Sequence, residues 1–186
     1  MDILAAFGLS ASAGLNAYIP LLVVSLLARF TNLITLAEPW NALKSWWIIG
    51  LLAVLSLIEF FADKVPAVNH INDIIQTFVR PAAGAILFAA SATVITEIHP
   101  IISIAAGLLV AGSVHAVKAA AVRPAITATT AGAANVPVSI LEDVISTTLS
   151  ILSIVLPIVV GIVLLILAIW IIWWLTRRTL RQTPRA

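Results

Sequence analysis

Residues 115–143, HAVKAAAVRPAITATTAGAANVPVSILED, are polar in an otherwise very apolar chain. Only 10% of the sequence is charged, whereas about 25% is usual in a soluble domain. This one stretch nevertheless contains Lys118, Arg123 and the adjacent acids Glu142 and Asp143. A charge in a bilayer is costly, so such residues face the protein interior, pair with one another or line a site. The chain must therefore fold so that these groups are enclosed.

The apolar remainder predicts an all-α integral membrane protein, namely a polytopic bundle of transmembrane helices with one or two broken or re-entrant segments. With 186 residues, the chain has room for one transmembrane domain, residues 1–176, followed by a basic tail, residues 177–186. The sequence has no Cys, which excludes disulfides and thiolate metal sites, and no motif indicates a cofactor. Its net charge of +2 does not indicate nucleic-acid binding, so the expected partner is the lipid bilayer.

The first apolar segment, residues 3–28, is long enough to cross a bilayer, which takes about 20 residues. Its middle contains Gly14, Asn16 and Pro20, and these residues predict a break in the helix between positions 14 and 20. Broken backbone at membrane depth persists only where it is packed in protein or lines a cavity. The alternative is a continuous helix that uses its small residues for packing and is kinked at the proline.

Three further spans are predicted at residues 46–62, 81–96 and 101–122. A short connection that ends in proline joins the last two, so they should pack as an antiparallel hairpin with close contacts at Gly and Ser. Between the first and second of these spans, residues 68–79 have apolar side chains on one helical face and polar ones on the other. We expect an amphipathic helix there, which lies in the membrane interface or caps the bundle.

Residues 124–136 are too rich in Thr, Gly and Asn for a lipid-facing span, and the helix is expected to resume at Pro137. Polar side chains then recur at steps of three or four residues, which places them on one helical face. This polar stripe consists of Ser139, Glu142, Asp143, Ser146, Ser150 and Ser153. A polar stripe on a membrane helix should face the interior of the bundle. We therefore predict that residues 124–153 form a re-entrant or broken hairpin.

The last span is predicted at residues 154–175, with a kink at Pro157. Four arginines follow it in the tail, and the positive-inside rule places them in the cytoplasm. The C-terminus is thus expected to lie in the cytoplasm. Trp residues near the ends of the predicted spans suit the aromatic belts of the membrane interfaces. Five or six crossings are expected, or four if residues 3–28 also re-enter.

The sequence Val-Arg-Pro-Ala occurs twice, at residues 79–82 and 122–125. If the two spans between them form a hairpin, both Arg-Pro corners should lie at the same depth and on the same side of the membrane. A weaker similarity relates residues 12–20 to residues 130–137, since each segment has an Ala-Gly pair followed by Asn and Pro. Paired broken segments point to a binding site in transporters, but short echoes in an Ala-rich chain also arise by chance.

The end of the span at 46–62, the start of that at 81–96 and the end of that at 101–122 share one side, where most charges gather. The candidate site residues are Glu59, Asp63, Lys64, Arg80, Lys118, Arg123, Asn135, Glu142 and Asp143. One interpretation is a structural network of ion pairs, because an unpaired buried charge is costly. The other is a polar vestibule open to one face. Its bases would hold a small anion or an anionic lipid headgroup, and its acids would carry protons or cations.

The sequence contains none of the common catalytic motifs considered for a membrane enzyme. HExxH, GxSxG and Gly-rich phosphate loops are absent, and the three histidines lack metal-ligand spacing. His115 lies one turn before Lys118, and we expect a packed, hydrogen-bonded histidine rather than a ligand. A Ser–Lys dyad of Ser139 and Lys118 is a weaker hypothesis. Enzymatic activity is therefore not the favoured interpretation.

Five short segments of the sequence together resemble the pattern of a known family. They are SAGLNAYIP at residues 12–20, EFFADKVP at 59–66, Val-Arg-Pro at 79–81, Arg-Pro at 123–124 and the acid pair at 142–143. In this order and spacing they resemble a bacterial membrane family known as domain of unknown function number four-one-two-six. The resemblance covers nearly the whole chain except the basic tail. It implies an integral membrane protein, which we expect in the bacterial inner membrane, and it brings no assigned activity, substrate or cofactor.

These features together favour a small transporter or lipid-handling permease, expected to work as a homo-oligomer because one copy is small. The alternative is a non-catalytic membrane scaffold or assembly factor held together by buried ion pairs. A transporter needs a water-reachable cavity that touches the charges, whereas a scaffold should show the charges closed in pairs.

Overall fold

The computed structural model describes residues 3–36, 38–64, 66–92 and 99–181, and every regular element in these ranges is a helix. Four helical stretches are long and apolar enough to span a bilayer. They are Ile71–Ser91, Pro100–Thr130, Asn135–Val155 and Pro157–Trp174. Shorter apolar helices accompany them, so the chain is an all-α membrane protein, as the composition predicts.

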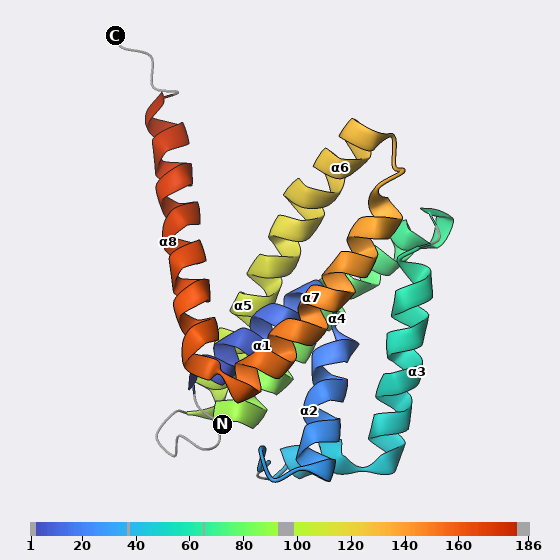
Figure 1. The fold of residues 1–186 in the computed structure, drawn as a ribbon, viewed down its shortest axis with the longest axis vertical. Coiled ribbons are helices and arrows are strands. Elements are labelled where there is room, and N and C mark those ends of the chain that lie inside the picture. Colours follow the sequence, from blue (N-terminus) through green and yellow to red (C-terminus); the bar gives the residue numbers. More distant parts are fainter. Residues whose placement is uncertain (1–2, 37, 65, 93–98, 182–186) are drawn as a thin grey trace.

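The first apolar segment is broken as predicted. Helix α1 covers Ile3–Leu15 and helix α2 covers Tyr18–Phe30, with the break at Asn16. The Asn16 Oδ1 atom accepts the N–H groups of Tyr18 and Ile19, at 3.1 and 3.0 Å, and so caps α2. Each helix has 13 residues and is about 20 Å long, well short of a hydrocarbon core of about 30 Å. Figure 1 shows that the outer ends of both helices lie at the same end of the bundle.

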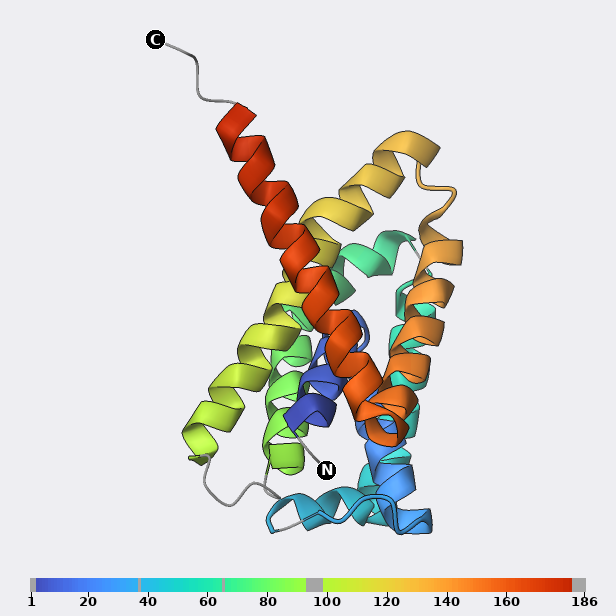
Figure 2. The ribbon, with the colours of Figure 1, turned by 60° about the vertical axis from the view of Figure 1, so that its left-hand side comes forward.

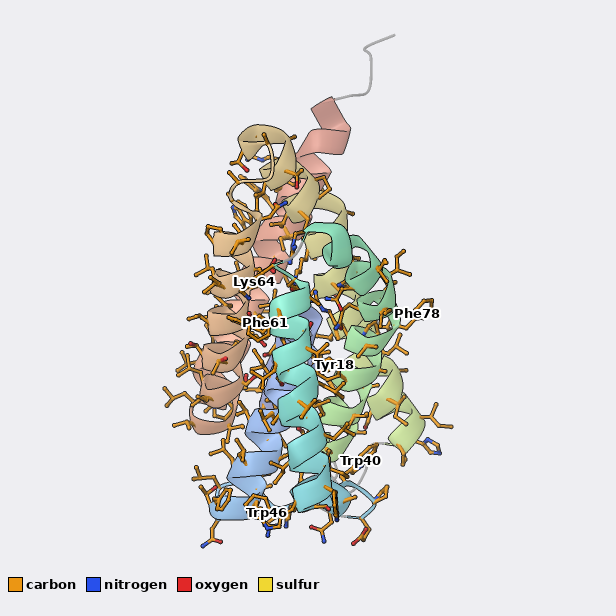
Figure 3. The ribbon with its side chains drawn as sticks, turned by 90° about the vertical axis from the view of Figure 1, so that its right-hand side faces the viewer. Tyr18, Trp40, Trp46, Phe61, Lys64 and Phe78 are labelled. Atoms are coloured by element: carbon orange, nitrogen blue, oxygen red, sulfur yellow. The ribbon has the colours of Figure 1, made fainter. Side chains whose placement is uncertain are left out.

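A short 3₁₀ turn, η1, covers Trp40–Lys44 and leads into helix α3, Trp46–Ala62, whose bounds match the predicted span. Figure 3 shows Trp40 and Trp46 together at the end of the bundle where α2 ends, whereas Lys64 lies toward the opposite end. The Trp46 side chain is 59% exposed, which suits an interfacial aromatic residue.

Helix α4 runs without interruption over Pro66–Ala92 and contains Pro81 in its interior. The prediction of a separate amphipathic helix before a span that begins at Pro81 is therefore wrong. The apolar face of the helix, including Ile71 and Phe78, is exposed, while Gln76 and Arg80 are buried. An amphipathic pattern also arises when a membrane helix turns its apolar face to lipid and its polar face inward.

Helix α5, Pro100–Val117, packs along α4, and the two helices lie side by side in Figure 2. A Cβ atom on Gly84 would come within 2.8 Å of the Gly107 carbonyl oxygen, and one on Gly107 would overlap the Gly84 carbonyl. Only glycine at both positions permits this backbone approach, which is typical of membrane helix pairs. The predicted hairpin is confirmed, although most of its connection, residues 93–98, lies outside the described residues.

The chain stays helical beyond the predicted end of this span. A π-helical turn, η2, covers Lys118–Val122 and is followed by helix α6, Arg123–Thr130, with Pro124 in its first turn. The widened turn accommodates Pro124, which has no N–H to donate and would crowd the preceding turn of a regular helix. The expected boundary at residue 122 is therefore wrong.

Helix α7, Asn135–Val155, follows a tight turn in which Ala131 and Gly132 have positive φ angles of 52° and 86°. Residues 124–153 thus form two helices joined at that turn, and the predicted broken backbone is confined to the turn itself. Helix α7 is unbroken and long enough to span. The re-entrant path of this hairpin stays a prediction.

Helix α8, Pro157–Arg181, begins anew after α7 ends at Val155. Leu156 has the non-helical angles φ −133° and ψ 58°, because a residue before proline is disfavoured in the α conformation. The predicted kink at Pro157 is in fact a complete break between two helices. Figure 1 shows α8 diverging from the bundle toward the end where the α6–α7 turn lies. The predicted tail begins within α8, and residues 182–186 lie outside the described residues.

Candidate functional site

Eight charged side chains meet inside the bundle and form what we call the ion-pair cluster. It contains four acids and four bases: Glu59, Asp63, Glu142, Asp143, Lys64, Arg80, Lys118 and Arg123. These residues come from α3 and the turn after it, α4, η2, α6 and α7. Five ion pairs link six of these residues, a sixth pair joins Lys64 to Asp143, and the formal charges of the eight cancel. All eight were predicted from the sequence as site residues, and the structure brings them together.

Asp63 lies at the end of α3, and its carboxylate forms ion pairs and hydrogen bonds with side chains of several helices. Its Oδ2 atom lies 3.3 Å from Arg123 Nη2 and 3.8 Å from Arg80 Nη2. The Ser139 hydroxyl donates to the same Oδ2 at 3.4 Å, and the Asn72 amide donates to Oδ1 at 2.7 Å. Both Arg-Pro corners therefore direct a guanidinium to one carboxylate, which agrees with their predicted common depth and side.

Glu59 lies one helical turn before Asp63 and is only 1% exposed. Its Oε1 atom accepts from Arg80 Nη2 at 2.9 Å. Arg80 also lies 3.3 Å, through Nη1, from His115 Nδ1, and the other ring nitrogen of His115 lies 3.3 Å from the Thr77 hydroxyl. His115 is thus a packed, hydrogen-bonded histidine, as expected, and it borders the cluster.

The π-helical turn explains why two bases reach one acid. Lys118 Nζ and Arg123 Nη2 lie 2.8 and 3.0 Å from the same Glu142 Oε2 atom. In a regular α-helix, side chains five residues apart point well away from each other, because each residue turns the helix by about 100°. The wider π turn brings Lys118 and Arg123 closer to one face. Such single π turns occur frequently at functional sites.

The break between α1 and α2 lies at the cluster. Lys118 Nζ donates to the carbonyl of Leu15, the last residue of α1, at 3.0 Å. Asn16, which caps α2 through its oxygen, donates through Nδ2 to Asp143 Oδ1 at 2.9 Å. Lys64 Nζ approaches the other Asp143 oxygen at 3.5 Å. The break and the charged site were each predicted from the sequence, but their contact was not, although Asn16 in an apolar segment was the available signal.

The polar stripe of α7 faces the bundle interior, as predicted, since its six members are the buried residues of that helix. Farther along α7 from the cluster, the Ser12 Oγ atom of α1 lies 2.9 Å from Ser146 Oγ and 2.7 Å from Ser150 Oγ, within hydrogen-bond distance. Hydroxyl pairs of this kind hold membrane helices together. The Ser139 hydroxyl donates to Asp63, and Lys118 contacts Glu142 and Leu15, so no Ser139–Lys118 dyad forms.

Asn135 lies apart from the ion-pair cluster. It stands at the start of α7, where its Oδ1 accepts from the Thr127 hydroxyl at 3.2 Å. The predicted open vestibule is also not what the structure shows, because the charges are closed into pairs. Arg80 is 0% exposed and Glu142 is 7% exposed. An apolar hollow on α8 is lined by Ile166, Ile169, Trp170 and Trp173, and none of these belongs to the cluster.

The cluster leaves some polar atoms without a partner. Among the described residues, the cluster atoms Glu59 Oε2 and Arg80 Nε and the neighbouring Gln76 Oε1 are buried and have no hydrogen-bond partner. A buried, unsatisfied polar group typically costs about 1–3 kcal/mol, so such atoms call for an explanation. Gln76 lies one turn before Arg80 on α4. It was not among the site residues predicted from the sequence, because its segment was expected to lie in the membrane interface or to cap the bundle.

The family described as Domain of unknown function (DUF4126) matches residues 3–178. The chain belongs to this family. The resemblance noted in the sequence is thereby confirmed. No curated protein and no solved structure matches the chain. Membership of DUF4126 assigns no activity, so a function has to be argued from the geometry.

Proposed function

We propose that this DUF4126 protein is a small membrane transporter whose substrate site is the ion-pair cluster. The observation that carries the proposal is the helix break inside that cluster. Lys118 donates to the Leu15 carbonyl at the end of α1, and Asn16 links the start of α2 to Asp143. Transporters commonly build their sites from discontinuous helices, whose ends offer free backbone groups at membrane depth. The proposed substrate is a small anion or an anionic lipid headgroup.

The closed pairs fit a transporter in its occluded conformation. Alternating access requires that a central site be sealed from both sides at one stage of the cycle. The unpartnered Glu59 Oε2 and Arg80 Nε atoms also support a functional site. A network selected only for stability would gain from satisfying both atoms.

A non-catalytic scaffold is the second candidate, and the closure of the ion pairs favours it. In a scaffold the charges would serve only to lock the helices together. The homo-oligomer stays a prediction under either function. The exposed apolar surface of α8 is available to lipid or to a second copy of the chain.

The variant Arg123→Ala separates the two functions. Each acid that contacts Arg123 has another base, since Asp63 also approaches Arg80 and Glu142 also binds Lys118. A transporter should therefore accumulate as folded protein but lose anion flux in reconstituted vesicles. The matched control is Arg29→Ala, because Arg29 stacks on Trp46 outside the cluster.

The scaffold hypothesis predicts the opposite result for Arg123→Ala. If the charges serve only to lock the helices, the Arg123 bridge between Asp63 and Glu142 is itself needed for folding, whatever bases remain. The folded yield in detergent would collapse, and neutralising Glu142 or Asp63 in the same chain would restore it. That pattern, together with no anion flux by the wild-type protein in vesicles, would defeat the transporter proposal.

The proposed topology places the C-terminus in the cytoplasm of a bacterial inner membrane and treats α1 and α2 as a re-entrant hairpin. Because the chain has no Cys, single cysteines report on accessibility. A cysteine at Leu33, after α2, should be labelled from the periplasm, and one at Ala133, in the α6–α7 turn, from the cytoplasm. Labelling of both from one side would contradict the arrangement in Figure 1.

A further inference from the structure

Asp63 occupies a site with the chemistry of an oxyanion receptor. Its carboxylate receives the guanidinium groups of Arg80 and Arg123, the hydroxyl of Ser139 and the amide of Asn72. These donors come from three helices, α4, α6 and α7. Paired arginines with neutral donors bind a carboxylate or phosphate wherever these groups occur, because their N–H geometry matches the oxygens.

Asp63 is the more distant acid for both guanidinium groups. Arg80 Nη2 lies 2.9 Å from Glu59 but 3.8 Å from Asp63. Arg123 Nη2 lies 3.0 Å from Glu142 but 3.3 Å from Asp63. If the Asp63 carboxylate left, each arginine would keep an acid partner. The Asp63 carboxylate is therefore the replaceable member of the cluster.

The duplicated Val-Arg-Pro-Ala sequence gains a structural role from this arrangement. Each copy supplies one guanidinium, and both guanidinium groups approach the same Asp63 Oδ2 atom. The first copy lies inside α4, and the second follows the π-helical turn that directs Arg123 inward. The two copies thus act as two halves of one clamp around an oxygen atom.

We propose that the Asp63 carboxylate is an internal occupant of an oxyanion site, and that a small carboxylate or phosphate group is the ligand that replaces it. This inference rests on the proposed transport function only for the movement of the ligand. The site itself is defined by the donors around Asp63. A soluble anion and a lipid headgroup present the same oxygens, so the experiment must separate these two sources.

The variant Asp63→Ala removes the internal occupant while leaving Arg80, Arg123, Ser139 and Asn72 in place. Its thermal unfolding in detergent is followed against sodium formate, inorganic phosphate and micelles that contain phosphatidic acid, with chloride at equal ionic strength as reference. We expect saturable stabilisation with a half-saturating concentration at least about tenfold below that of the wild-type protein, the factor that one charge-assisted hydrogen bond typically provides.

Stabilisation by formate or phosphate identifies a soluble anion, and stabilisation only by the micelles identifies a lipid headgroup. The matched control is Glu38→Ala, because Glu38 is an exposed acid just before η1 and takes part in none of the six ion pairs among the described residues. This control should respond like the wild-type protein. Adding Arg123→Ala to Asp63→Ala should abolish the response. Equal responses of Asp63→Ala and Glu38→Ala would overturn the inference.

If Asp63→Ala does not fold in chloride, its folded yield is measured after solubilisation in formate or phosphate. Recovery by either oxyanion supports the site, and failure of all probes overturns it. The proposed function is tested separately by anion flux through the wild-type protein in vesicles. Binding by Asp63→Ala without wild-type flux would leave the oxyanion site standing and remove the transporter. Anion flux through the wild-type protein without oxyanion binding by Asp63→Ala would support the transporter and overturn the oxyanion site.

Discussion

Helices α7 and α8 follow each other directly in the chain and have similar lengths, 21 and 25 residues, but they build opposite surfaces. Every buried residue of α7 is polar or charged. Among the side chains of α8 that the structure describes, only Val160 is buried. The more apolar helix is thus the one that contributes least to the interior, as its separation from the bundle in Figure 1 also indicates.

The difference shows how a bilayer alters the usual rule for a protein core. Lipid tails are as apolar as leucine, so apolar side chains gain no hydrophobic stabilisation by leaving lipid for the bundle. Polar side chains have no partner in lipid, and they turn inward to find one. In α7 the inward face is therefore the serine and acid stripe, whereas α8 directs isoleucine and leucine outward.

The largest effect is expected from removing a charge on the inner face of α7. In Glu142→Ala, Lys118 keeps only the Leu15 carbonyl among its described contacts, so a buried ammonium loses its carboxylate. Breaking such a pair typically costs about 3–5 kcal/mol of unfolding free energy. Thermal unfolding in detergent should show this loss. Leu141→Ala is the control, because Leu141 is 55% exposed on the same helix. Equal losses of unfolding free energy in the two variants would contradict the difference between the inner and outer faces of α7.

A smaller effect is expected where α1 meets both helices. A Cβ atom at Gly8 would overlap the Ser153 hydroxyl of α7 and come within 2.8 Å of Val160 Cγ1 in α8. Gly8→Ala should therefore force the helices apart and destabilise the protein by about 1–3 kcal/mol. Gly50→Ala is the matched control, because nothing lies within 4 Å of its added Cβ atom. A stability difference between these two alanine variants measures the packing, and its absence would contradict the close approach.

The smallest effect is expected on the outer face of α8. Leu165 is 61% exposed, so Leu165→Ala removes few contacts within the chain and should change stability by no more than about 0.5 kcal/mol. Its thermal unfolding should match that of the wild-type protein. A loss as large as that of Gly8→Ala would mean that this face is covered, which would favour the predicted homo-oligomer.

Local patterns in the sequence were sufficient to predict much of the fold. The bounds of α3, the break near Asn16 and the inward polar stripe of α7 follow from patterns within a single segment. Helix α4 was misjudged because the same amphipathic pattern suits a helix on the membrane surface and one with its polar face buried. Only its neighbours in the fold distinguish these two cases.

The sequence by itself determined that this chain lies in a membrane, that the charges of three consecutive spans gather toward one side, and that the first segment is broken. Composition and helical periodicity carry that information locally. The tertiary structure alone decided that Lys118 and Asn16 join the break to the ion pairs, and that both arginines reach Asp63. Such pairings depend on helix rotation and on the π-helical turn, which set the positions of side chains far apart in the chain. Charge balance identifies which groups must pair, but only geometry selects the partners.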